Sequence, residues 1–149
     1  MSLEKNIMEA LKTAMKAKDQ GALAALRAIK SELILAKTSG DSSELTEADE
    51  NKILQKLVKQ RKDSAVIFKE QNREDLVTPE LEQAAVISQF LPKQMSEAEV
   101  EKVVSDIIAQ TGANSMKDMG KVMGLTNSQL AGKADGKTIS GIVKSMLSN

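Results

Sequence analysis

The chain has 149 residues and a mass of 16.1 kDa, and its 41% apolar and 28% charged residues are typical of a globular protein with a core. Lysine and arginine together number 21, as do aspartate and glutamate, so the net charge gives no sign of a polyanionic partner. The absence of cysteine and histidine excludes disulfides, thiolate nucleophiles, histidine acid–base catalysis and metal sites built on thiolate or imidazole. Without tryptophan or tyrosine, and with two phenylalanines, a surface that stacks single-stranded bases is nearly excluded.

Targeting and membrane segments are not predicted. Charged residues interrupt the apolar positions of the first fifteen residues, so no signal-peptide core is formed. The longest apolar run, residues 22–26, is far shorter than the ~20 residues that span a membrane. We therefore expect a cytoplasmic protein without membrane contact, bound metal or cofactor.

Helical periodicity accounts for the first part of the chain. Apolar residues recur at intervals of three and four, which places them on one face of each helix. Three helices are predicted at residues 3–17, 20–37 and 47–70, after the N-cap candidates Ser2, Asp19 and Thr46.

The start of the fourth helix has two interpretations. Thr78 and Pro79 are typical of an N-cap followed by a proline in the first turn, with the helix ending near Phe90. An earlier start near Arg73, with a break at Pro79, is the alternative.

Three further helices are predicted after a proline-containing stretch. Their expected starts are the capping box at residues 96–99, the similar pattern at 115–118, and the turn at 134–136; Gly112 ends the first of the three. No segment alternates with period two, so strands are not predicted. The fold is expected to be all-α with about seven helices: an N-terminal four-helix domain, residues 1–94, and a C-terminal three-helix bundle, residues 95–149.

Four short blocks carry a family resemblance. They are VKQRKDS at 58–64, FLPKQ at 90–94, DMGKVMG at 118–124 and GKADGK at 132–137. In this order and at these spacings, the chain resembles the stand-alone, YqeY-type members of the GatB/YqeY-like family over essentially its whole length. Residues 125–129 depart from the pattern, because they include no basic residue where one is expected.

The resemblance implies an all-helical protein in two parts. It also implies kinship with the C-terminal tail of the B subunit of the tRNA-dependent amidotransferase, a tail that contacts tRNA. That enzyme converts Glu-tRNA(Gln) or Asp-tRNA(Asn) to the amide form in other domains. The family therefore implies no catalytic residue here, and at most an association with carbon–nitrogen ligase activity.

Charge is unevenly distributed along the sequence. Residues 52–73 carry a net charge of +5, residues 74–111 of −6, and residues 112–149 of +3. The lysines of the last segment are the candidate nucleic-acid-binding residues: Lys117, Lys121, Lys133, Lys137 and Lys144. Neighbouring glycines could let backbone amides approach a phosphate, especially at the Gly136 helix start, or could simply allow close helix packing. In the third helix the cations could be solvated or could face the acidic segment.

Two further features each have a structural and a functional interpretation. Arg61 lies on the apolar stripe of the third helix, where it could pair with Glu82 or Asp63, or form a fork for a carboxylate or phosphate; otherwise the stripe is wrongly phased. Methionines 116, 119 and 123 share one helical face, which suits core packing or an adaptable partner groove.

The leading hypothesis is a non-catalytic accessory protein that binds structured RNA, expected to be tRNA, through the C-terminal lysines. Such binding would be weak and dependent on salt. The alternative is a helical protein–protein interaction module without nucleic acid, whose partner could be the amidotransferase or another protein. An unrecognised enzyme would need an enclosed pocket with converging carboxylates.

Overall fold

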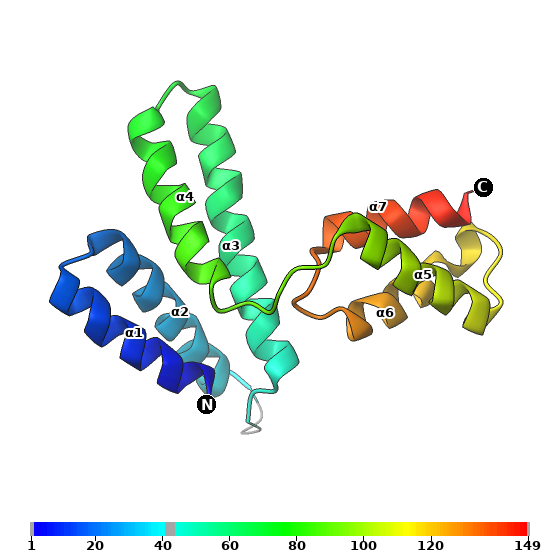
Figure 1. Ribbon diagram of the computed structural model, residues 1–149, viewed down its shortest axis with the longest axis horizontal. Coiled ribbons are helices and arrows are strands. Elements are labelled where there is room, and N and C mark those ends of the chain that lie inside the picture. Colours follow the sequence, from blue (N-terminus) through cyan, green and yellow to red (C-terminus); the bar gives the residue numbers. More distant parts are fainter. Residues whose placement is uncertain (1, 41–43, 149) are drawn as a thin grey trace. The chain divides into compact units, whose positions relative to one another are not determined.

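The computed structural model describes residues 2–40 and 44–148, and every regular element in these ranges is helical (Figure 1). Seven α-helices and one 3₁₀ turn, η1, are present in this part of the chain. Their bounds are α1 Leu3–Ala17, α2 Gln20–Thr38, α3 Glu47–Glu70, α4 Glu74–Ser88, α5 Glu97–Thr111, η1 Met116–Asp118, α6 Met119–Gln129 and α7 Gly136–Leu147. The predicted all-α fold with seven helices is confirmed.

The chain divides into two compact units, which we call the N-terminal unit, Met1–Leu91, and the C-terminal unit, Pro92–Asn149. The division falls slightly before the boundary expected after Gln94. Hydrogen bonds explain the difference: the Gln94 side chain donates to the Gly132 carbonyl at 2.7 Å, and the Met95 N–H donates to the Lys133 carbonyl at 2.8 Å.

The N-terminal unit consists of two helical hairpins, α1–α2 and α3–α4, and α2 packs against both α3 and α4. Its core contains apolar residues that recur at helical intervals, together with neighbours outside that periodicity such as Leu23, Leu57 and Ile87. Buried members are Ile7, Leu11, Ala14, Leu23, Ala25, Leu26, Ile29, Leu33, Leu54, Leu57, Val58, Ala84 and Ile87. Burial of these apolar side chains is the main source of stability for the unit.

The C-terminal unit is a bundle of α5, α6 and α7, which all pack against one another. Its core contains Val100, Val104, Ile107, Val122, Leu130, Ala134, Ile139, Val143 and Leu147. Thr126 is fully buried in α6, and its hydroxyl donates to the Val122 carbonyl at 2.8 Å. The one buried hydroxyl on this helix is therefore satisfied within it.

Side-chain caps begin most of the helices. Ser2, Asp19, Thr46 and Ser96 each accept a hydrogen bond from a backbone N–H three residues later, which satisfies a donor that has no partner inside the helix. At α3 the cap is reciprocal, because the Asp49 carboxylate accepts from the Thr46 N–H at 3.1 Å. The predicted caps of these four helices are confirmed.

The fourth helix confirms the alternative start near Arg73, while the Thr78 cap and the break at Pro79 are wrong. Helix α4 begins at Glu74, so Thr78 is not its cap, and Pro79 lies inside the helix without ending it. The first turn is closed by the Val77 N–H, which donates to the Arg73 carbonyl at 3.1 Å. Proline so near the start removes a single helical hydrogen bond, and burial of Val77 holds the preceding turn in place.

The sixth helix also begins differently from the prediction. Residues 116–118 form a 3₁₀ turn, and the α-helix begins at Met119. Ser115 caps this turn, because its hydroxyl accepts from the Lys117 N–H at 3.4 Å. The Asp118 carboxylate accepts from the Asn114 N–H at 3.1 Å, just before the turn.

None of the helices in residues 2–40 and 44–148 combines the length and hydropathy needed to cross a membrane.

Candidate nucleic-acid interface

The five candidate lysines all lie on the surface of the C-terminal unit. Lys117 lies in η1, Lys121 in the first turns of α6, Lys133 in the loop before α7, and Lys137 and Lys144 near the two ends of α7. Within the described residues, no carboxylate oxygen lies within 4.0 Å of any of the five ammonium groups. Their positive charge is therefore available to a ligand.

Helix geometry separates these lysines into groups. Lys137 and Lys144 are seven residues apart, so they lie on one face of α7, about 10 Å apart along the axis and away from the buried Ile139 and Val143. Lys121 lies on the side of α6 that faces away from the buried Thr126. Since α6 and α7 pack against each other, their outer faces point to different sides of the bundle.

The two ends of α7 each bring a pair of lysines into the same region. Lys133 and Lys137 lie at its N-terminal end, on either side of the Asp135 cap. The turn η1 packs against α7, and in Figure 1 it lies beside the C-terminal end of that helix, which places Lys117 near the end that carries Lys144. The structure therefore gives a basic surface that extends along α7 and not one converging cluster.

The start of α7 is already occupied by a carboxylate. Asp135 Oδ1 accepts from the Thr138 N–H at 2.6 Å, and the negative charge lies at the positive end of the helix. The Asp135 carboxylate therefore competes with a phosphate for the backbone N–H groups at the Gly136 helix start, where the sequence favours one. A phosphate can still be contacted by the flanking lysines Lys133 and Lys137.

Charge is segregated within the C-terminal unit. Helix α5 carries four carboxylates and one lysine, whereas the stretch from η1 through α7 carries five lysines and two aspartates. Both aspartates, Asp118 and Asp135, accept hydrogen bonds from backbone N–H groups at helix starts. A ligand with negative charge is thus favoured on the side of η1, α6 and α7 and repelled by α5.

The glycines of this region do not serve close helix packing. A Cβ atom added at Gly120, Gly124, Gly136 or Gly141 would meet no other atom within 4 Å. Gly132 has another role, because its φ of 80° lies in the left-handed region that favours glycine. The open space beside the helical backbone is a feature that the sequence alone did not reveal.

Arg61 lies between α3 and α4, and the ion pair expected with Glu82 or Asp63 is not formed among the described residues. Its Nε lies 3.4 Å from Oε1 of Gln83. Asp63 instead accepts from Lys59 at 2.6 Å, because residues four apart share a helix face and residues two apart do not. The stripe itself is correctly phased, since Val58 and Ala65 on either side of Arg61 are buried.

The remaining cations of the third helix do not pair with the acidic fourth helix. Among the described residues, the ion pairs of this hairpin are Lys59–Asp63 within α3 and Arg73–Asp75 at the start of α4. Both are exposed. Exposed pairs of this kind contribute little to stability.

The methionine face is mostly core. Met119 and Met123 pack against the core of the C-terminal unit, whereas Met116 is 41% exposed. No group of three or more aspartate or glutamate side chains that could hold a metal ion occurs in the described part of the chain.

The comparison with protein families gives one match. The family model described as Yqey-like protein matches residues 4–147, which is nearly the whole chain. None of the curated protein sequences compared matches the chain. The match agrees with the four sequence blocks, and the chain belongs to the YqeY-like family.

Proposed function

We propose that the C-terminal unit binds the phosphate backbone of structured RNA, expected to be tRNA, and that the protein acts as a non-catalytic accessory factor. The observation that carries the proposal is the charge segregation of this unit. The five candidate lysines have no carboxylate partner within 4.0 Å among the described residues. They lie on η1, α6, α7 and the loop before α7, whereas α5 carries four carboxylates. Such a distribution favours a polyanion on the basic surface that extends along α7.

The residue types limit the mode of recognition. Lysine–phosphate contacts position an RNA but do not read its sequence. Both phenylalanines, Phe68 and Phe90, belong to the N-terminal unit, so base stacking on the lysine surface has no aromatic platform. We therefore expect modest affinity that depends on RNA shape and falls steeply with salt.

The identity of the RNA is inferred from the family resemblance. The sequence blocks resemble the amidotransferase B-subunit tail, which points to tRNA and to an association with a carbon–nitrogen ligase in the cytoplasm. No catalytic role is proposed for this chain.

The proposal is tested by filter retention of total tRNA at low salt. The test variant is Lys133→Glu/Lys137→Glu, which reverses charge at the N-terminal end of α7. The matched control is Lys102→Glu, an exposed lysine of the same unit on the acidic α5. We expect the double variant to lose at least tenfold in affinity and the control to bind within about twofold of the native protein. Equal retention of all three proteins would contradict the proposed surface.

A further inference from the structure

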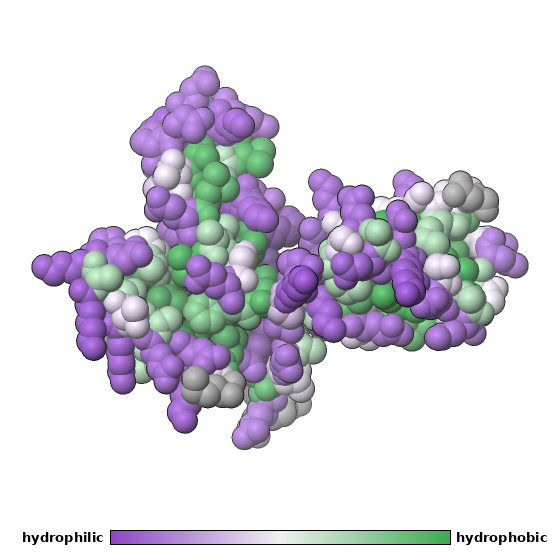
Figure 2. All heavy atoms as spheres, in the orientation of Figure 1, coloured by the Kyte–Doolittle hydropathy of each residue, from purple (hydrophilic) through white to green (hydrophobic). Residues whose placement is uncertain are grey.

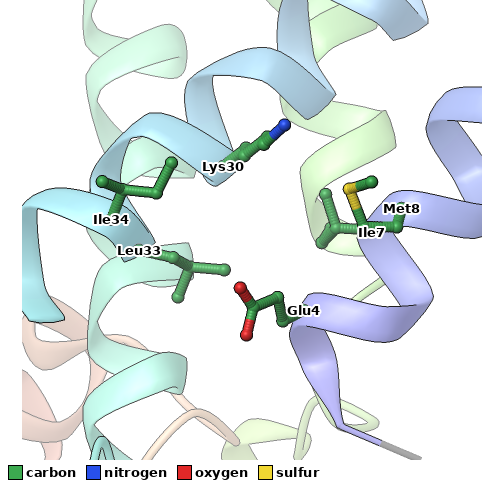
Figure 3. A pocket seen from close by; sticks show the side chains of 6 residues that line it. All are labelled: Glu4, Ile7, Met8, Lys30, Leu33 and Ile34. Carbon is green, nitrogen blue, oxygen red and sulfur yellow. The ribbon is translucent and has the colours of Figure 1, made fainter.

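A groove lies between α1 and α2 in the N-terminal unit (Figure 3). It is lined by Glu4, Ile7 and Met8 of α1 and by Lys30, Leu33 and Ile34 of α2. Its cavity volume of about 30 Å³ is far below the ~300–1,000 Å³ of small-molecule sites, and it suits at most the end of one apolar side chain of a partner.

Apolar side chains form both the floor and the walls of this groove. Ile7 and Leu33 are buried beneath it, while Met8 and Ile34 remain 41% and 50% exposed at its edges. Figure 2 shows apolar surface on the α1–α2 hairpin among hydrophilic side chains. A groove with an apolar floor and exposed apolar walls gains free energy when a partner covers it.

Exposed side chains continue along the same faces of the two helices beyond the groove. Met15 follows Met8 by seven residues on α1, so it lies on the same face, two turns further on, and is 54% exposed. On α2, Arg27 precedes Ile34 by the same interval. The groove and these exposed side chains together form a surface that is elongated along the helix axes, as a binding surface for a helix is.

Cations border this apolar surface. Lys12 lies between Met8 and Met15 on α1, and Arg27 and Lys30 border the groove from α2. No carboxylate among the described residues lies within 4.0 Å of these three cations.

The one acidic lining residue is neutralised. Glu4 accepts from the Lys37 ammonium group at 2.6 Å, so it contributes no net charge to the groove. A second copy of the chain would bring like charges together, whereas an acidic partner would complement them.

We propose that the α1–α2 groove binds an acidic amphipathic helix, which inserts an apolar side chain between Met8 and Ile34 and whose carboxylates meet Lys12, Arg27 and Lys30. This is a protein interaction of the N-terminal unit, separate from the RNA contact proposed for the C-terminal unit. A concave slot with an apolar floor favours an inserted helix side chain over a membrane surface.

The test uses a labelled synthetic helical peptide with leucines at i, i+3 and i+7 and glutamates beside them, followed by fluorescence anisotropy. A second peptide keeps the leucines and replaces the glutamates with lysines. The protein variants are Ile34→Asp and Lys30→Glu. Matched controls are Leu35→Asp, a neighbouring side chain that is 58% exposed on another face of α2, and Lys16→Glu on α1 outside the groove lining. Anionic vesicles and tRNA are titrated in parallel.

The proposal expects saturable binding of the acidic peptide, with at least a tenfold loss for Ile34→Asp and Lys30→Glu and no change for the two controls. The lysine peptide is expected not to bind. All substituted side chains are exposed or border the surface, and circular dichroism checks that each variant is folded. The proposal is overturned by absence of saturation at about 1 mM peptide, by equal binding of all variants, or by losses that appear with vesicles or tRNA in place of the peptide. Because the peptide assay contains no RNA, its failure leaves the proposed tRNA contact unaffected.

Discussion

Arg61 of α3 meets Gln83 of α4, with the guanidinium Nε 3.4 Å from the amide oxygen Oε1. The Nη1 atom lies 3.5 Å from the Leu57 carbonyl in the same helix. Both distances are long for hydrogen bonds. Arg61 is half-buried, so its aliphatic stem covers apolar surface between the helices while the charge remains close to water.

This geometry predicts that Arg61→Met leaves stability within about 1 kcal/mol of the native protein, because methionine replaces the stem and only weak polar contacts are lost. Arg61→Ala should be less stable than Arg61→Met, since it also removes the stem. Urea unfolding followed by circular dichroism measures both. A loss above about 2 kcal/mol for Arg61→Met would show that the guanidinium itself is the stabilising group.

The capping box of α3 predicts a dependence of stability on pH. Hydrogen bonds from the Thr46 backbone N–H and hydroxyl lower the pKa of Asp49 below its usual 3.8. A lowered pKa in the folded state contributes stability above the unfolded value, and the contribution is lost as pH falls through the folded pKa. Asp49→Asn should therefore reduce stability at pH 7.

The same comparison at a pH well below 3.8 should show native protein and Asp49→Asn converging. Glu101→Gln changes an exposed carboxylate of α5 that does not take part in the Ser96 cap; it serves as the control and should change stability little at either pH. A loss for Asp49→Asn that is equal at both pH values would show that the carboxylate charge does not contribute.

Asp135 predicts a stability effect at the start of α7. Asp135→Ala removes the acceptor of the Thr138 N–H and should cost about 1 kcal/mol. Asp135→Asn should retain most of the stability, because asparagine caps helices about as well as aspartate. Thermal or urea unfolding of the two variants measures this difference, and equal losses would exclude the capping role.

Pro79 predicts a gain in stability on replacement. Proline has no N–H to donate to the Asp75 carbonyl four residues earlier, so Pro79→Ala restores one helical hydrogen bond and should stabilise α4 by about 1 kcal/mol. Thr78→Ala is the control, since Thr78 lies inside the helix and does not cap it. Urea unfolding should show a gain for the first variant and little change for the second. If Thr78→Ala instead lowered the free energy of unfolding by about 1 kcal/mol, as loss of an N-cap does, the helix would begin at Thr78.

Local features of the fold were predictable because their causes lie close together in the sequence. Helix α5 begins after Ser96, whose side chain accepts from a backbone N–H three residues later, and it ends at Gly112, whose φ of 69° favours glycine. The sequence leaves the start of α4 open between Arg73 and Thr78, because Thr78 and Pro79 fit a helix start as well as a second turn. Burial of Val77 by tertiary packing decides between them.

The candidate sites depended more strongly on tertiary contacts. Sequence alone does not favour Gln83 over Glu82 as the neighbour of Arg61, since that choice depends on how α4 packs against α3. It also did not identify the α1–α2 groove, although Met8 and Met15 recur at an interval of seven beside the buried stripe. The packing of α2 against α1 brings Ile34 opposite Met8.

The central claim is tested most directly by the salt dependence of tRNA binding for the native protein and for Lys121→Glu/Lys133→Glu/Lys137→Glu, with Lys102→Glu as control. If the lysines of α6 and α7 contact phosphates, the logarithm of the native binding constant falls linearly with the logarithm of salt concentration. The triple variant then binds more weakly with a slope shallower by about 2 to 3 units, and the control matches the native slope. A native protein that is folded and retains no tRNA at low salt, or a triple variant with an unchanged slope, would contradict the account.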